Sequence, residues 1–318
     1  MLKDSLLEIL YILCGLVSLY SAFCTFKDKN HQSRIPTTLF WAILAFIFMF
    51  SRIGLVWGNK DIFVSDLTIG YLVIILALLS ALKVVKFPKF NESSEEFKNK
   101  MSQVIGNKIF IPAITLALFT VVIAQIWSKQ IGTIVPIGIS SIVSIILALS
   151  ITKGSSKEMM DDGRRLLEVV GPVNILPQLL AALGSVFTAA GVGNVIAGGI
   201  ENVIPKENIL LGVIAYCVGM AVFTIIMGNG FAAFSVITAG IGVPFVIAQG
   251  GNPVIVGALG LTAGYCGTLL TPMAANFNIV PTAILEIKDK KYGVIKYQAP
   301  IAIAMLVIHI LLMYFWAF

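Results

Sequence analysis

The sequence is poor in charge, with only 12% of its 318 residues being Asp, Glu, Lys or Arg. A soluble domain carries about twice that fraction. The mean hydropathy of +0.95 exceeds what a buried core alone can supply, because a core must be wrapped in polar surface. The composition therefore indicates a protein whose main partner is the lipid bilayer.

Groups that carry common enzyme chemistry are also scarce. There are two histidines and four cysteines, with no Cys-x-x-Cys pair, no His-Glu-x-x-His, no Gly-x-Ser-x-Gly and no phosphate-binding Gly-x-x-x-x-Gly-Lys-Ser/Thr motif. We therefore expect no enzymatic activity, no ATP hydrolysis, no disulfide framework, no metal site and no organic cofactor. The basic residues behind the net charge of +6 are distributed among the loops between apolar runs, so no nucleic-acid partner is expected either.

What the sequence has in abundance is long apolar runs. A helix needs about 20 apolar residues to cross the hydrocarbon core of a bilayer. Five runs in the first half have about that length, at 5–26, 36–57, 64–82, 109–127 and 132–152. Together with the later runs they predict an all-α polytopic membrane protein with about nine or ten hydrophobic segments.

The basic residues predict the orientation of these segments. Most of the 22 lysines and arginines fall in alternate polar gaps, at 27–34, 83–108, 153–165 and 286–296. Short loops rich in Lys and Arg stay in the cytoplasm. We therefore expect a multi-pass protein of the bacterial inner membrane, with both the N-terminus and the C-terminus outside.

The two halves of the chain differ in composition. Residues 1–152 read as a five-span scaffold or interface region, 153–171 as a cytoplasmic linker and 172–318 as a transport region. More than half of the 28 glycines lie between 191 and 267. Hydrophobic segments broken by Gly and Pro are a pointer to a transporter's binding site, which places the function in the second half.

Residues 209–247 are expected to form a hairpin around Gly228-Asn229-Gly230. Two full spans, or a re-entrant hairpin with its tip at mid-membrane, would both return to the same side. The absence of Lys and Arg at the turn favours the re-entrant form. Asn229 is either a substrate ligand or a turn residue that tolerates a left-handed backbone.

Residues 252–285 are expected to form a broken helix, followed by a final span at 300–318. Gly264 and Gly267 favour unwinding, and Pro272 removes a backbone donor and clashes with the preceding turn. Unwound carbonyls would bind a cation, which assigns Gly264 and Gly267 to an ion-binding backbone. The neutral polar groups around the break are candidate substrate ligands, namely Thr268, Thr271, Asn276 and Asn278. Thr271-Pro272 could also be a plain helix kink.

Two charged residues lie in the early spans. Arg52, near the outer end of the second run, is expected to reach the interface or to pair with an acid such as Asp66, with direct anion contact as the alternative. Glu8 is expected at the membrane interface.

The runs 228–234 and 264–278 resemble a bacterial membrane family known as a domain of unknown function and commonly assigned as one subunit of a two-component 5-oxoproline (pyroglutamate) transporter. The likeness extends to 178–184 and 191–194 and is most specific at 271–278, Thr-Pro-Met-Ala-Ala-Asn-Phe-Asn. The resemblance implies a second, smaller membrane subunit, a small carboxylate as substrate and membership of the broad ion-transporter superfamily. Members of that superfamily usually have two inverted halves, whereas this chain shows one clear hairpin and one broken helix, as a split transporter would.

The function that these observations favour is secondary active transport of a small organic carboxylate, 5-oxoproline above all, coupled to Na⁺ or H⁺. The substrate ligands would be Gly228, Asn229, Gly230, Thr268, Thr271, Pro272, Asn276 and Asn278. Na⁺ is slightly favoured as coupling ion, because these motifs contain no buried acid. The alternative is a non-transporting accessory or scaffold subunit of a membrane complex, and a homo-oligomer is also conceivable.

Overall fold

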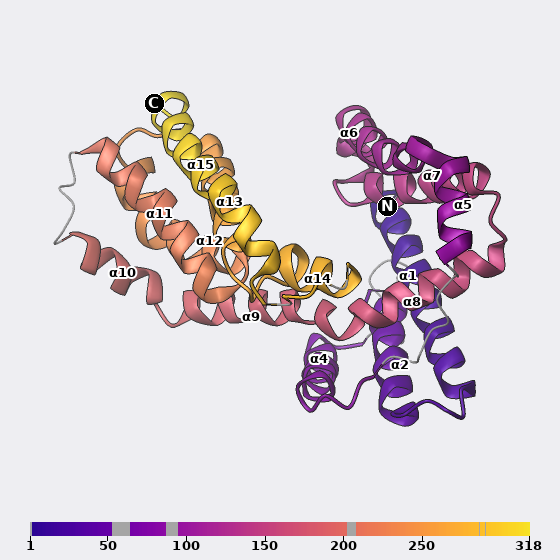
Figure 1. Cartoon of the computed structure of the whole chain (residues 1–318). Helices are drawn as coiled ribbons and strands as arrows, with labels where there is room; N and C mark the ends of the chain where they lie inside the picture. The colour runs from indigo at the N-terminus through magenta and orange to yellow at the C-terminus, as the bar shows by residue number, and fades with distance from the viewer. Residues whose placement is uncertain (1, 53–63, 87–94, 202–207, 286, 290) are drawn as a thin grey trace. The chain divides into compact units, whose positions relative to one another are not determined.

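The computed structural model describes the backbone of residues 2–52, 64–86, 95–201, 208–285, 287–289 and 291–318. Throughout these residues the regular structure is helical and no strand occurs (Figure 1). The predicted all-α class is confirmed. Four of the lysines in the polar gaps, on which the predicted membrane orientation depends, lie outside the described ranges, namely Lys60, Lys89, Lys206 and Lys290.

The chain divides into two compact units, Met1–Val169 and Val170–Phe318. The helices of the first unit are α1 (Leu2–Lys27), α2 (Arg34–Phe50), α4 (Asp66–Ala81), α5 (Glu95–Ile105), the 3-10 turn η2 (Gly106–Phe110), α6 (Ile111–Ile131), α7 (Val135–Thr152) and most of α8 (Ser156–Asn174). Those of the second unit are α9 (Leu176–Ala189), α10 (Val192–Glu201), α11 (Ile209–Met227), α12 (Gly230–Ile237), the π-helix η3 (Thr238–Ile247), α13 (Pro253–Leu269), the π-helix η4 (Ala275–Ile279), α14 (Val280–Ile284) and α15 (Gly293–Trp316). The segment predicted as a linker, 153–171, lies mostly in α8.

The apolar runs of the sequence form helices of membrane-spanning character. Within the described ranges, six helices are long and apolar enough to cross a bilayer, and α9 with α10, bent by 66°, form a seventh span if the pair crosses once. Three shorter apolar helices, α2, α4 and α13, bring the apolar segments to the predicted number. Large apolar side chains such as Val121, Ile126 and Val186 are more than half exposed, as expected for surfaces that face lipid. The chain is a multi-pass membrane protein.

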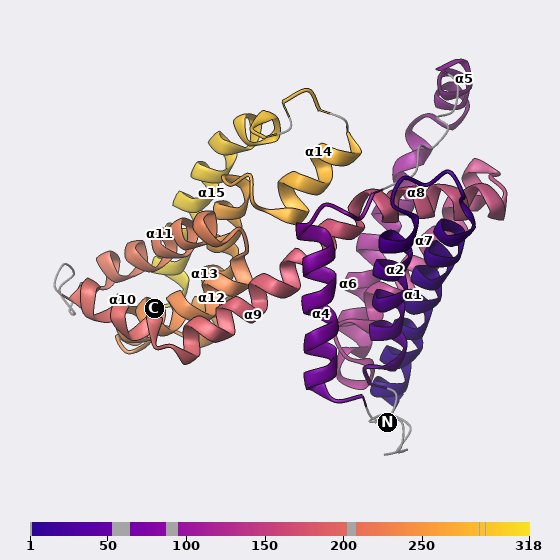
Figure 2. The ribbon, with the colours of Figure 1, turned by 90° about the horizontal axis from the view of Figure 1, so that it is seen from below.

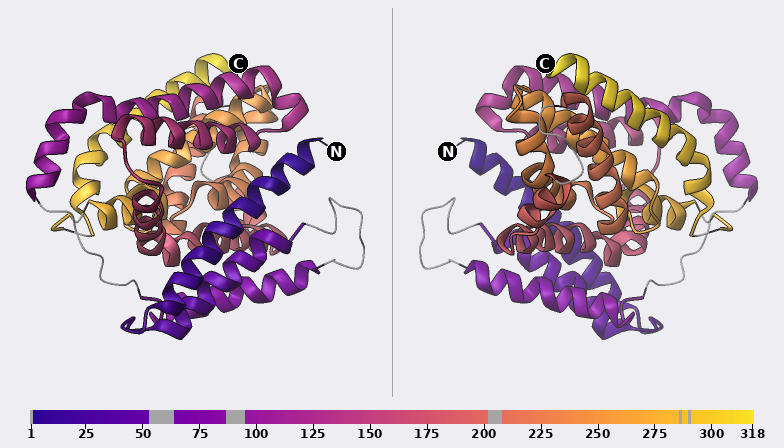
Figure 3. Two further views of the ribbon diagram at one scale, coloured as in Figure 1. Left: turned by 90° about the vertical axis from the view of Figure 1, so that its right-hand side faces the viewer. Right: turned by 90° about the vertical axis from the view of Figure 1, so that its left-hand side faces the viewer.

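The first unit is organised around the antiparallel pair α1 and α2, with α4 beside α2 and the pair α6–α7 beside α1 (Figures 2 and 3). Gly15 permits the close approach of α1 and α2, because a Cβ there would overlap the side chain of Met49 and lie 3.1 Å from the carbonyl oxygen of Ala45. Leu7, Ile123 and Val135 form a small apolar core between α1, α6 and α7. A small residue between α1 and α2 thus allows close van der Waals packing, which drives helix association in lipid, where the hydrophobic effect does not.

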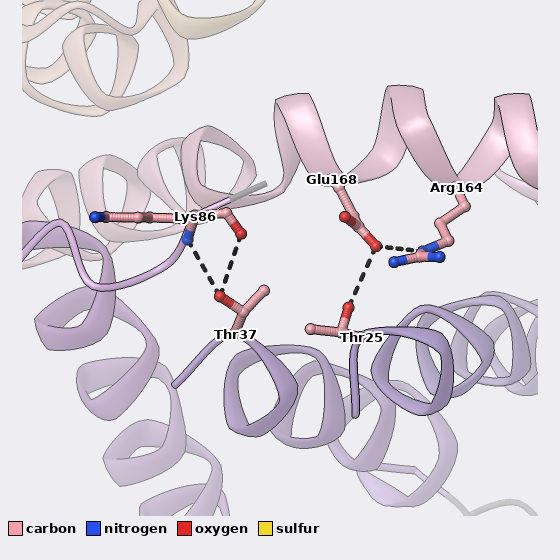
Figure 4. A network of polar contacts seen from close by, with 5 residues as sticks. All are labelled: Thr25, Thr37, Lys86, Arg164 and Glu168. Carbon is pink, nitrogen blue, oxygen red and sulfur yellow. Dashed lines mark hydrogen bonds and ion pairs between the residues drawn. The ribbon is translucent and has the colours of Figure 1, made fainter. Parts of the chain in front are cut away.

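A polar network fastens α8 and the segment before 87 to the first two helices (Figure 4). Glu168 of α8 is 2% exposed, accepts a hydrogen bond of 3.3 Å from the hydroxyl of Thr25 in α1, and pairs with Arg164 one turn earlier at 2.5 Å. The hydroxyl of Thr37 in α2 accepts from the Lys86 N–H at 3.1 Å and donates to the Lys86 carbonyl at 3.2 Å. Burial raises the pKa of Glu168, although Arg164 and Thr25 act in the opposite direction.

The second unit has a dense core that joins α11, η3, α13 and α15. Figure 1 shows α11, α13 and α15 side by side, and the right-hand view of Figure 3 shows α15 from the left-hand side of Figure 1. Tyr216 of α11 is fully buried, its hydroxyl makes a 2.7 Å hydrogen bond with that of Thr238 in η3, and its ring occupies the space above Gly242 and Gly260. The core positions the turn after α11 against the end of α13.

Polar residues start the helices of this unit where the sequence would place them. The side chain of Asn208 accepts from the N–H of Leu211 at 3.0 Å and begins α11, and that of Asn252 accepts from the N–H of Val254 at 3.0 Å and begins α13. Asparagine is a preferred residue at this position, because its oxygen satisfies an amide that has no partner in the first turn.

The structure places both charged residues of the early spans. The expected pairing of Arg52 with an acid is confirmed, but the acid is Asp4 of α1, 3.7 Å away, and not Asp66. Glu8 is 1% exposed and faces the protein, while its depth in the membrane stays a prediction. Arg52 reaches Asp4 because α2 folds back along α1, which brings the end of α2 to the start of α1.

Candidate functional site

The site is built where the turn between α11 and α12 meets the break after α13. Gly228 ends α11 in a left-handed conformation, with φ +72°, and its N–H donates to the Thr224 carbonyl at 2.7 Å. A Cβ on Gly228 would lie 2.9 Å from the Cβ of Met273 and 3.0 Å from its carbonyl oxygen. Glycine is therefore required here both by the backbone angle and by the contact with the break.

Asn229 is the N-cap of α12. Its backbone is extended, with φ −147°, and its Oδ1 accepts hydrogen bonds from the N–H groups of Phe231 at 2.8 Å and Ala232 at 3.4 Å. The next residue, Gly230, faces the ring of Tyr265 in α13, which a Cβ would meet at 3.3 Å. The turn residue in the left-handed region is thus Gly228, and Asn229 serves as a cap through its oxygen.

The helical backbone of α13 is interrupted between Leu269 and Ala275, within the range predicted to hold a broken helix. Thr271 is 2% exposed, and its hydroxyl accepts from the N–H of Met273 at 3.3 Å. Pro272 follows directly, and the chain resumes as the π-helix η4. The threonine and proline together account for the break, since proline can neither donate to the preceding turn nor continue it.

Asn278 holds the two ends of the break together. Its Nδ2 donates to the carbonyl oxygens of Thr268 at 2.9 Å and Thr271 at 2.8 Å, and the residue is 4% exposed. The hydroxyl of Thr268 donates to the Tyr265 carbonyl at 2.6 Å. One buried amide therefore bonds to two carbonyls beside the break, of which that of Thr271 also accepts from the N–H of Ala274 at 3.4 Å.

Two buried oxygens near this contact have no hydrogen-bond partner among the described residues. One is Oδ1 of Asn278 and the other is the hydroxyl of Thr224, which lies next to Gly264, one turn before Gly228. A buried polar atom without a partner costs about 1–3 kcal/mol. Such atoms mark a place where a ligand, an ion or a water can complete the hydrogen bonding.

Gly264 and Gly267 lie in uninterrupted helix, so the expectation that the backbone unwinds at these glycines is wrong. A Cβ on Gly267 would overlap the carbonyl oxygen of Ala221, and a Cβ on Gly264 would lie 2.8 Å from Cε of Met220. Both glycines allow α13 to pack closely on α11, and the helix persists until Leu269. Their role as ion-binding backbone stays a prediction.

Of the predicted site residues, the structure brings Gly228 and Gly230 against α13 and the break, and it places Thr268, Thr271, Pro272 and Asn278 within or beside the break. The side chain of Asn276 lies outside the described residues. Sequence reasoning missed Thr224 and Tyr265. Thr224 could have been found as a polar residue one helical turn before the turn glycine.

Aromatic rings flank the same region. The ring of Tyr265 lies 6.1 Å from that of Phe231 in α12 and 5.9 Å from that of Phe277 in η4, measured between centroids. The rings of Phe231 and Phe277 are 59% and 40% exposed. The polar contact is thus bordered on one side by a row of aromatic faces.

The two described cavities lie elsewhere. One, of about 490 Å³, is lined by Phe26 and by residues between His31 and Pro36, and the other, of about 830 Å³, by Leu285, Ile287, Asp289 and the first turns of α15. Neither is lined by residues of the turn–break contact. At that contact Thr224, Thr268, Thr271 and Asn278 are buried, whereas Asn229 is half-buried.

A family model matches residues 8–318, nearly the whole chain, and its description is "Protein of unknown function (DUF979)". The chain belongs to this family. No curated protein and no solved structure matches it. The turn–break contact lies inside the matched range, so it is part of the DUF979 region and not an appendage to it.

Proposed function

We propose that the chain is a subunit of a secondary active transporter for a small organic carboxylate such as 5-oxoproline, driven by Na⁺ or H⁺. The observation that carries the proposal is the pair of unpartnered buried oxygens, on Thr224 and Asn278, beside a helix that breaks within an apolar unit. Polar groups and irregular backbone among membrane helices are costly, and in transporters they form the substrate site.

The chemistry of the contact suits a small amide-containing anion. The cap at Asn229 uses Oδ1, so the amide nitrogen Nδ2 remains as a donor for a carboxylate. The first turn of α12 adds the positive end of a helix dipole, while its N–H groups at Phe231, Ala232 and Ala233 already donate to Asn229. The unpartnered oxygens can accept from a lactam N–H or bind Na⁺, and the aromatic rings around Tyr265 can cover a flat ring.

The remaining parts of the proposal rest on sequence. The basic loops favour a bacterial inner-membrane location with both termini outside, and the resemblance of 271–278 supports a second, smaller membrane subunit as partner. We propose no enzymatic activity and no cofactor beyond the coupling ion. Because Thr224, Thr271 and Asn278 are buried, a substrate reaches them only when the turn and the break separate.

The test is uptake of labelled 5-oxoproline by cells that express the chain with and without the second subunit. Thr271→Val and Thr224→Val remove one hydroxyl each with little change of shape, and we expect each to lower uptake at least tenfold. Thr262→Val is the matched control in α13, because its hydroxyl is exposed and bonds only to the carbonyls of its own helix at Ala258 and Leu259. We expect this control to transport normally.

Each variant is co-purified with the second subunit to check assembly. Absence of uptake with both subunits present, across several carboxylates, would refute the proposal. Normal uptake by the Thr224 and Thr271 variants, or by Asn229→Ala, would instead favour the accessory subunit that binds no substrate. Replacing Na⁺ by choline, at fixed pH, identifies the coupling ion.

A further inference from the structure

An acidic side chain lies inside the first membrane-spanning helix. α1 is one of the helices long and apolar enough to cross a bilayer, and Glu8 lies two turns from its start. The residue is 1% exposed although most large apolar side chains of the same helix, such as Leu13 and Phe23, are exposed to more than 40%. Glu8 thus faces the protein and not the lipid, which is where functional acids of membrane helices lie.

Neither oxygen of the Glu8 carboxyl group has a hydrogen-bond partner among the described residues. An ionised carboxylate without partners in an apolar interior is very costly, and in practice such a group neutralises itself by binding a proton. The arrangement contrasts with Glu168, the other fully buried acid of the described chain, which has Thr25 and Arg164 as partners.

The register of α1 and α2 places one cation near this acid. Gly15 lies against Ala45 and Met49, so Glu8, two turns before Gly15, falls level with Arg52, two turns after Ala45. The guanidinium of Arg52 lies 3.7 Å from Asp4, one turn earlier on α1. Arg52 is therefore paired with a half-exposed acid at nearly the level of the buried one.

The other elements packed on α1 bring little charge. α7 carries no titratable residue, α6 carries only Lys129 in its last turn, and Arg34 lies at the opposite end of α2. On α1 itself the neighbouring groups are Lys3, Asp4 and Tyr11, of which Lys3 lies against Gly132. Lys60 and Asp61 follow α2 in the sequence and lie outside the described residues.

We propose that Glu8 is a proton-binding site inside the membrane, with the proton as its ligand and Arg52 as the group that stabilises the carboxylate once the proton has left. In the step, the O–H bond of the acid breaks, the electron pair stays on the carboxylate and the proton passes to water at the end of α1. The Arg52 guanidinium then moves from Asp4 toward Glu8. Use of this proton to drive uptake rests on the proposed function, whereas the proton site itself does not.

The test is labelling of the full chain, in membrane vesicles, with dicyclohexylcarbodiimide over a series of pH values. This apolar reagent dissolves in the bilayer and reacts with a protonated carboxyl group, whose proton goes to a nitrogen of the carbodiimide while the oxygen bonds to its central carbon. Transfer of the acyl group to nitrogen then leaves a stable adduct that peptide mass spectrometry locates. We expect an adduct at Glu8 that decreases as the pH rises.

Glu158, which is exposed, and Asp289, which is half-exposed, lie outside the spans and are internal controls that should stay unmodified. Glu8→Gln removes the adduct, and Glu8→Asp, which keeps the acid, restores a pH-dependent one. Absence of an adduct at Glu8 in the folded chain, or an adduct that does not change with pH, overturns the proposal. Either result would mean that Glu8 does not bind and release a proton over this pH range.

Uptake separates this proposal from the proposed function. If labelling behaves as expected and no carboxylate is taken up, the proton site stands and the transport proposal fails. If 5-oxoproline uptake in Glu8→Gln keeps the pH profile of the unmodified chain, the proton does not drive transport. A pH-independent residual uptake in Glu8→Gln, with the pH profile regained in Glu8→Asp, is the outcome that we expect.

Discussion

Replacement of Gly267 by alanine tests the packing of α13 on α11 most directly. The new Cβ would overlap the carbonyl oxygen of Ala221 and lie 2.9 Å from its carbonyl carbon and 3.0 Å from its Cα. These are backbone atoms, which cannot rotate away, so the two helices must move apart. Overpacking of this kind costs about 1–3 kcal/mol, and the higher helix propensity of alanine returns up to about 1 kcal/mol.

Gly257→Ala is the matched control, because it lies in the same helix and the nearest atom to its new Cβ is Cζ of Phe234 at 3.8 Å, an ordinary contact. Both variants share the gain in helix propensity, so their difference isolates the steric cost. We expect Gly267→Ala to be less stable than Gly257→Ala by about 1–3 kcal/mol.

The assay is reversible unfolding of the purified chain in mixed micelles, with the fraction of denaturing detergent as the variable and helix content as the readout. Equal midpoints for the two variants would refute the close approach of α11 and α13. A lower midpoint for Gly257→Ala than for Gly267→Ala would refute the register of α13 as well. Either result would reopen the possibility that the backbone unwinds at Gly267.

Two further predictions concern single side chains. Asn229→Ala should lower the unfolding free energy by about 1 kcal/mol, because the first turn of α12 loses its cap. Asn229→Ser keeps a side-chain oxygen that can cap the helix and should lose far less. Equal losses in the two variants, measured as midpoints in the same detergent assay, would contradict the cap. Because burial raises the pKa of Glu168 in the folded state, its contribution to stability is fully present below the ordinary carboxyl pKa and is lost as the pH rises through the raised value. The melting temperature of the native chain relative to Glu168→Gln should therefore fall as the pH rises through that window, and a constant difference would show that the shift is absent.

Much of the fold follows from the one-dimensional pattern of apolar residues. The long runs are helices because a backbone in lipid must satisfy its own hydrogen bonds. The turn at Gly228 follows from two glycines around an asparagine, and the break between Leu269 and Ala275 from a proline after a threonine. These features depend on neighbours in sequence, so sequence alone predicts them.

The features that sequence reasoning missed depend on neighbours in space. Gly264 can unwind a helix or let another helix approach, and only the presence of Met220 and Thr224 across the contact decides between the two. The burial of Glu8 likewise depends on tertiary packing, which its position in the sequence does not reveal. Thr224 matters only because it lies next to Gly264.

The same close contacts have a mechanical consequence. Tyr216 fills the spaces over Gly242 and Gly260 and bonds to Thr238, and Gly267 lies on the backbone of α11. Because so little free volume separates them, α11, η3 and α13 can neither slide nor rotate separately, and we expect them to move as one rigid body. In the transport that we propose, the motion that opens the site would therefore pivot at the irregular backbone between Leu269 and Ala275, which would make these residues the hinge as well as the lining.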